Sequence, residues 1–132
     1  MNSGRQETSV RRETNYFKAT EALLRNYGNL LRLRGVGETG DDETLIRLEK
    51  ALGLFEGEKE YAVIRMYYLG EDINGRPAPS PMSLERVAFE LRDAGLIGGD
   101  KTARRWRDRI VRDIAICMYG APAAEYFARR GK

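Results

Sequence analysis

The sequence predicts a compact all-α domain of about five helices. Its apolar residues recur at three- and four-residue spacings through most of the chain, and no alternating apolar pattern is long enough for a sheet. Clusters of glycine or proline interrupt this periodicity at a few places and separate the helices. With 132 residues, of which 42% are hydrophobic, the chain has the size and apolar content of one packed domain.

The first helix is expected to follow a polar arm. Residues 1–14 are polar and without periodicity, so we expect them to be disordered. A long amphipathic helix is expected over residues 15–35, because Phe17, Leu24 and Leu31 are seven residues apart. This spacing suits packing on the chain's own core and also pairing with a second copy of the chain. The sequence therefore leaves two alternatives, a monomer and a homo-oligomer.

Two further helices and a loop complete residues 15–82. A second helix is expected after the Gly-rich break at residues 36–40, with Asp41 and Asp42 at its start. Its buried face should contain Leu45, Leu48 and Leu52. A third helix is expected over residues 59–69, with its tyrosines in the core rather than in a stacking platform. The Asn-Gly pair and the prolines of residues 70–82 predict a surface loop.

Residues 83–132 predict two helices joined by a short turn, followed by a tail. Ser83 should cap the first helix, which ends at Gly95. Asp100 should cap the second helix, which extends to about Tyr119, and residues 123–130 add a helical turn or two. The apolar stripe predicted for the second helix contains Ala103, Trp106, Ile110, Ile114 and Cys117. Two helices in this arrangement are typical of a helix-turn-helix.

Positive charge is concentrated in the second of these helices. The net charge of +3 is mild, but residues 83–132 hold 11 basic and 7 acidic side chains, whereas residues 1–82 hold 12 and 13. The segment from Lys101 to Arg112 contains six basic residues and one acid, Asp108. Such clustering indicates a polyanionic partner; a solvated face with acids in reach is the alternative.

The exposed side of this helix predicts an interface with double-stranded DNA. A recognition helix contacts bases mainly through its N-terminal turns, where Arg and Lys bind guanine or phosphate. The residues expected at bases or nearby phosphates are Lys101, Thr102, Arg104 and Arg105. Arg109 and Arg112, one to two turns later, are expected at flanking phosphates.

The composition argues against an enzyme, a metal site or a cofactor. The chain has no histidine and one cysteine, Cys117, which excludes histidine-dependent catalysis, a zinc site and an intramolecular disulfide. It has no phosphate-loop motif, and the acidic residues between 38 and 43 lack the spacing of a calcium loop. No apolar run is long enough to span a membrane or to act as a signal peptide, so we expect a cytoplasmic protein without a membrane partner.

Four segments resemble one protein family. They are Glu-Ala-Leu-Leu-Arg-Asn-Tyr at 21–27, the Glu- and Tyr-rich run at 58–68, residues 83–91, and Lys-Thr-Ala-Arg-Arg at 101–105. From about Glu21 to Tyr119 the chain resembles phage late-gene transcriptional regulators of the ArpU/RinA type, which are similar to region 4 of sigma-70 factors.

This resemblance implies a transcriptional regulator that binds a specific DNA sequence. It implies that Thr102, Arg104 and Arg105 lie at base edges or phosphates, that Arg86 lies beside the DNA backbone, and that RNA polymerase is a further partner. The alternative is a small terminase-like DNA-packaging subunit that uses the same two helices on DNA and oligomerises through its N-terminal helix.

Overall fold

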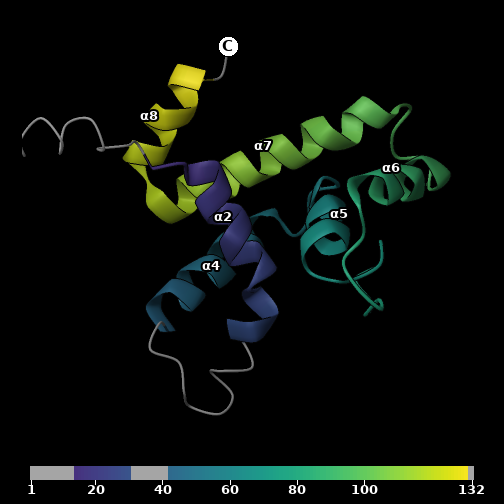
Figure 1. The fold of residues 1–132 in the computed structure, drawn as a ribbon, viewed down its shortest axis with the longest axis horizontal. Coiled ribbons are helices and arrows are strands. Elements are labelled where there is room, and N and C mark those ends of the chain that lie inside the picture. The colour runs from purple at the N-terminus through teal and green to yellow at the C-terminus, as the bar shows by residue number, and fades with distance from the viewer. Residues whose placement is uncertain (1–13, 31–41, 131–132) are drawn as a thin grey trace, which may run out of the picture.

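The computed structural model describes residues 14–30 and 42–130, and this part of the chain is all-helical (Figure 1). The expectation of an all-α fold is confirmed for these residues, whose only β-type pairing is an isolated bridge between Glu71 and Pro77. The expected arm and the Gly-rich break lie outside them. The elements are α2 (Tyr16–Arg25), α4 (Asp42–Phe55), α5 (Tyr61–Val63), the π-helical η1 (Ile64–Tyr68), α6 (Leu84–Asp93), α7 (Asp100–Tyr119) and α8 (Ala121–Arg130).

Helix α7 is the axis of the fold. Its 20 residues extend for about 30 Å at the usual rise of 1.5 Å per residue. The helices α2, α4, α5, α6 and α8 all contact it. In Figure 1, α8 lies at its C-terminal end and α6 at its N-terminal end. The first turns of α7 therefore lie at one end of the molecule, beside α6 and away from α8.

Two apolar clusters pack against α7. The first joins α2, α4 and the C-terminal half of α7, with Leu24, Leu48 and Ile114 fully buried. The second joins α6 to the start of α7 and contains Val87, Leu91 and Ala103. The segment formed by α5 and η1 lies between the clusters and contributes side chains to both. Tyr61, Ile64 and Tyr68 belong to the first cluster, and Ala62, Val63 and Met66 to the second.

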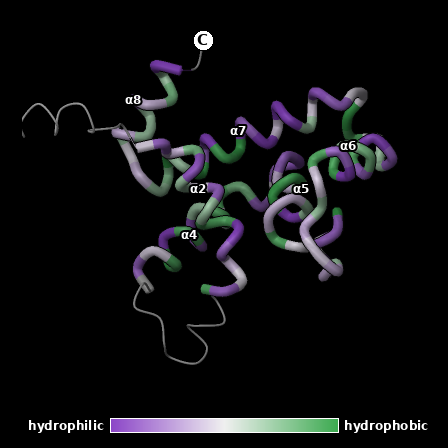
Figure 2. The backbone as a smooth tube through the Cα atoms, viewed as in Figure 1, coloured by the Kyte–Doolittle hydropathy of each residue, from purple (hydrophilic) through white to green (hydrophobic). Residues whose placement is uncertain are grey.

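The buried face of α7 differs from the predicted stripe. Ala103, Ile110 and Ile114 are buried as expected, but Trp106 is half-buried and Cys117 is exposed. Val111, Ala115 and Met118 are buried in addition. With 100° of turn per residue, the centre of the observed buried face is rotated about the helix axis by roughly 60° from the centre of the predicted stripe. Figure 2 shows that hydrophobic and hydrophilic residues alternate along α7.

Local capping explains where α6 ends and where α7 begins. The Ser83 hydroxyl accepts a hydrogen bond from the Arg86 amide at 3.1 Å, so the predicted cap is confirmed. Gly95 has φ +76°, and the amide of the next residue, Leu96, donates to the carbonyl of Leu91 at 2.9 Å, which is a Schellman motif.

The predicted cap of α7 is wrong by one residue. Gly99 occupies the N-cap position, and no side chain caps the helix there. Asp100 lies in the first turn, where it forms an ion pair with Arg92 of α6 and still complements the helix dipole.

Two predicted helices are interrupted. The first was expected to extend to about residue 35, but α2 ends at Arg25, with Asn26 as its C-cap and a further helical stretch at residues 27–30. The third divides into α5 and η1, because the Leu69 amide donates to the carbonyl of Ile64, five residues earlier, at 3.1 Å.

The Pro-rich loop at residues 70–82 is held to η1 by backbone hydrogen bonds. The Met82 amide donates to the Met66 carbonyl at 2.8 Å. Within the loop, the Asp72 carboxylate accepts from the amides of Arg76 at 2.9 Å and Asn74 at 2.8 Å. These two hydrogen bonds define a turn within the loop. They also lower the pKa of Asp72, and the bond from the Arg76 amide has the larger effect.

Candidate nucleic-acid interface

Three basic side chains project from the first turns of α7. Lys101, Arg104 and Arg105 are exposed. Within the described part of the chain, Lys101 and Arg104 have no acidic partner, and Arg105 donates a hydrogen bond to the Thr102 hydroxyl at 3.2 Å. Asp100, the acid of this turn, is paired with Arg92 instead. The exposed end of α7 is therefore positively charged, and the helix dipole adds to that charge.

Helix α6 supports these turns from behind. Val87 and Leu91 of α6 lie in the same buried cluster as Ala103 of α7, which fixes the face of α7 that carries the basic side chains. Arg86 is exposed near the start of α6, where its Nε donates to Glu90 at 2.8 Å. The four predicted residues of α7 and Arg86 therefore lie on two adjoining helices.

The two predicted residues further along α7 have acidic partners. Arg109 donates to the Glu60 carboxylate at 2.7 Å and lies 3.9 Å from Glu58 and 3.8 Å from Asp113. Arg112 is half-exposed, and its Nε lies 3.4 Å from Asp113. The charge of Arg109 is thus largely offset inside the protein, whereas that of Arg112 is offset less.

Arg107 is one of the six basic residues between Lys101 and Arg112, but the clustering of charge did not reveal that its side chain is paired inside the protein. Only 11% of its side chain is exposed, and its Nε lies 2.6 Å from Asp108. Its Nη1 lies 3.8 Å from Glu21 of α2, which also accepts a hydrogen bond from the Tyr68 hydroxyl at 2.6 Å. Burial and this hydrogen bond raise the pKa of Tyr68 above its ordinary value. Arg107 therefore joins α2, η1 and α7.

A spacing signal for Arg107 is present in the sequence. It lies four residues after Ala103 and three before Ile110, which places it on the buried face by helical periodicity. Its partner Glu21 lies far away in the sequence, so the pairing itself has no local signal.

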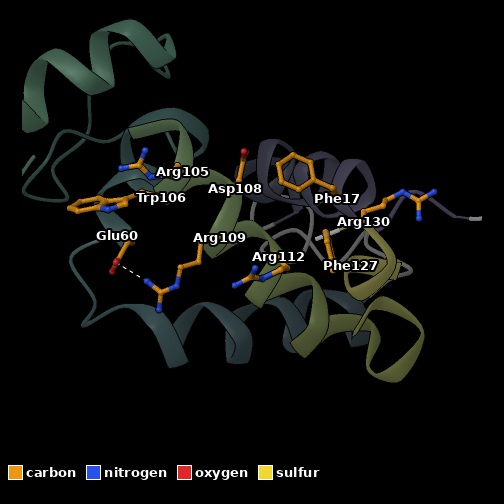
Figure 3. Close-up of a pocket in the computed structure, with 9 residues that line it drawn as sticks. All are labelled: Phe17, Glu60, Arg105, Trp106, Asp108, Arg109, Arg112, Phe127 and Arg130. Atoms are coloured by element: carbon orange, nitrogen blue, oxygen red, sulfur yellow. Dashed lines mark hydrogen bonds and ion pairs between the residues drawn. The ribbon is translucent and has the colours of Figure 1, made fainter. Parts of the chain in front are cut away.

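An open hollow lies along the outer side of α7 (Figure 3). Five α7 residues between Arg105 and Arg112 line one side, Phe17 of α2 and Phe127 of α8 line another, and Glu60 contributes to its wall. Trp106, which was expected in the core, also faces this hollow and is only half-buried. The hollow was not predicted, because residues far apart in the sequence line it.

The described residues offer little for metal or nucleophilic chemistry. No cluster of three or more potential metal-ligating side chains occurs among them. Cys117 is exposed, and partial burial and the nearby Asp113 raise the pKa of its thiol, which disfavours the reactive thiolate. No helix in the described ranges is long and apolar enough to cross a membrane.

Comparisons with known proteins add no relative. No protein-family model, no curated protein and no solved structure matches this chain. Functional inference therefore rests on the residues of α6 and α7 and on the geometry around them.

Proposed function

We propose that this protein binds double-stranded DNA through the N-terminal turns of α7 and acts as a transcriptional regulator. The observation that carries the proposal is the exposed set Lys101, Arg104 and Arg105, which has no acidic partner among the described residues and lies at the end of a helix that α6 supports. A basic helix end of this kind suits the major groove, which the phosphates of both strands flank.

In this proposal α6 and α7 act as a helix-turn-helix. The first turns of α7 enter the major groove, where Arg104 and Arg105 bind bases or phosphates and the Thr102 hydroxyl adds a hydrogen bond. Arg86 of α6 lies at the DNA backbone, and Arg112 contacts a flanking phosphate. Arg109 would have to leave Glu60 to contact DNA, so we assign it a supporting role.

The connection between the two helices has its own geometry. Residues 94–99 separate α6 from α7, which is longer than the usual turn of about three to four residues. The Schellman motif at Gly95 reverses the chain direction at the start of this connection. The apolar contact of Leu91 with the Ala103 cluster keeps the helices together despite the longer turn.

The regulatory role rests on the resemblance of residues 21–119 to phage late-gene regulators. The action is binding alone, at a specific sequence and in contact with RNA polymerase. The packaging alternative assigns assembly to the N-terminal helix, but Thr20 and Leu24 of α2 are fully buried in the chain's own core. This burial leaves less apolar surface for a ring and favours the regulator.

A salt series of DNA binding tests the interface. Fluorescence anisotropy with a random duplex compares wild type with a Lys101→Ala/Arg104→Ala variant. A plot of the logarithm of affinity against the logarithm of salt concentration has a slope of about −0.9 per phosphate contact. The variant should therefore bind more weakly, and its slope should be shallower by about one to two.

The matched control removes two positive charges elsewhere. Arg47→Ala/Lys50→Ala has the same net charge, and both of its side chains are exposed on α4. This control should keep the wild-type slope, and circular dichroism should show unchanged helicity in both variants. Equal weakening by the two variants would mean that total charge, and not α7, determines binding, and the proposal would be wrong.

A further inference from the structure

We propose that the hollow beside α7 binds unpaired nucleotides of single-stranded DNA. This inference rests on the proposed function, since it adds a second DNA site on the same helix. The hollow has a volume of about 820 Å³, within the range of about 300–1,000 Å³ typical of small-ligand sites. Figure 3 shows Trp106 on one side of the view and Phe17 and Phe127 on the other, with Arg109 and Arg112 between them.

The aromatic rings supply stacking surfaces. Trp106, Phe17 and Phe127 come from three different helices, and each is half-buried, so part of each ring stays accessible. Phe127 is held by an edge-to-face contact with Tyr126, with ring centroids 5.0 Å apart. Every base has a flat face, and stacking on fixed aromatic rings is how proteins hold single strands without reading their sequence.

The arginines around these rings supply phosphate contacts. Arg105 and Arg112 line the hollow from α7, and Arg130 lines it from α8. Arg105 and Arg112 are seven residues apart, or about 10 Å along the helix axis. This spacing allows them to contact different parts of one extended strand.

The two acids of the hollow do not cancel this charge. Asp108 lies 2.6 Å from Arg107 outside the hollow, and Glu60 accepts a hydrogen bond from Arg109 at 2.7 Å. Both carboxylates are thus engaged by arginines, so they offset only part of the positive charge of the arginines that line the hollow, of which Arg112 also lies 3.4 Å from Asp113.

The aromatic faces decide between paired and unpaired DNA. In a duplex the bases expose only their edges in the grooves, because their faces are stacked on each other. Phe17 and Phe127 line the hollow from α2 and α8 and Trp106 lines it from α7, and the exposed part of such rings stacks on a base that is free of its partner. Arg105 belongs both to this hollow and to the proposed duplex interface, so the two sites adjoin.

Trp106 provides a direct readout, because it is the chain's only tryptophan. We would titrate its fluorescence with an eight-nucleotide thymidine strand at about 50 mM salt, where phosphate contacts are strong. An abasic strand of the same length has the phosphates without the bases. The inference predicts saturable quenching by the thymidine strand and roughly tenfold weaker binding of the abasic strand.

Two variants separate stacking from packing and charge. Phe127→Leu keeps an apolar side chain beside Tyr126 but removes the flat ring, so it should weaken single-strand binding about tenfold. Arg130→Gln, at an exposed position, should weaken it and reduce its salt dependence. Both should keep the wild-type thermal midpoint and duplex affinity, whereas Lys101→Ala/Arg104→Ala should lose duplex affinity and keep most of the quenching.

Equal affinity for the thymidine and abasic strands would overturn the inference, since only charge would then be recognised. Absence of quenching while the duplex still binds would also overturn it and leave the proposed function standing. Quenching by the single strand without duplex binding would instead overturn the proposed function and support the site in the hollow.

Discussion

Thr20 stands out among the individual residues because its hydroxyl has no hydrogen-bond partner in the described part of the chain. It is fully buried on α2, and its oxygen is the one buried side-chain polar atom of the described residues without a hydrogen bond. A buried hydroxyl without a partner costs about 1–3 kcal/mol of desolvation. The residue therefore lowers the stability of the contact between α2 and the core.

Replacing Thr20 by valine should stabilise the protein by about 1 kcal/mol, because valine has nearly the same shape and no polar atom to bury. Urea unfolding should show a higher midpoint with an unchanged slope. Thr44→Val, at a half-exposed position on α4, is the control and should change stability by less than about 0.5 kcal/mol. A lower midpoint for the Thr20 variant would mean that this hydroxyl does form a hydrogen bond.

The end of α6 depends on a single glycine. Gly95 has φ +76°, and nothing lies within 4 Å of the position where a Cβ would stand. A side chain there would meet backbone strain but no steric clash. The nearby Gly98 also has open space around it but does not have a positive φ, so the pair separates conformation from crowding.

Gly95→Ala should lower the free energy of unfolding by about 1 kcal/mol, because alanine is strained in the left-handed region. Gly98→Ala should leave stability nearly unchanged or raise it slightly, since it reduces the freedom of the unfolded chain. Chemical denaturation of the two variants measures the difference. Equal effects would show that the Schellman motif does not hold the end of α6.

The elements differ in how far the sequence predicted them. The limits of α6 and α7 were nearly right because their signals are local: a serine cap, a glycine at the Schellman position, and Gly120 after the last turn. The π-helical break in η1 has no comparable local signal. The rotation of the buried face of α7 arises from packing against five other helices, which no single segment encodes.

In the candidate site, too, features with a local sequence signal were predicted and features that depend on tertiary packing were not. Exposure of Lys101, Arg104 and Arg105 follows from the periodicity of α7 alone, and the structure agrees with it. The pairing of Arg107 with Glu21 and of Arg109 with Glu60 joins distant segments, and so does the hollow with Phe17 and Phe127. Contacts of this kind require the tertiary fold.

Across the whole molecule, α7 separates structural from exposed charge. Its middle holds Arg107 and Arg109 in ion pairs with α2 and with the segment before α5. Its first turns, at the far end from α8, keep Lys101 and Arg104 without acidic partners in the described chain. This division predicts that a duplex contacts one end of the molecule and leaves α4 untouched.

The most direct test is to record backbone amide resonances while a random duplex is added at low salt. We expect the largest shifts at residues 99–105 and at the start of α6 near Arg86, with α4 unchanged. Shifts confined to α4 or α8, with none at residues 99–105, would contradict the assignment of the first turns of α7 as the DNA interface.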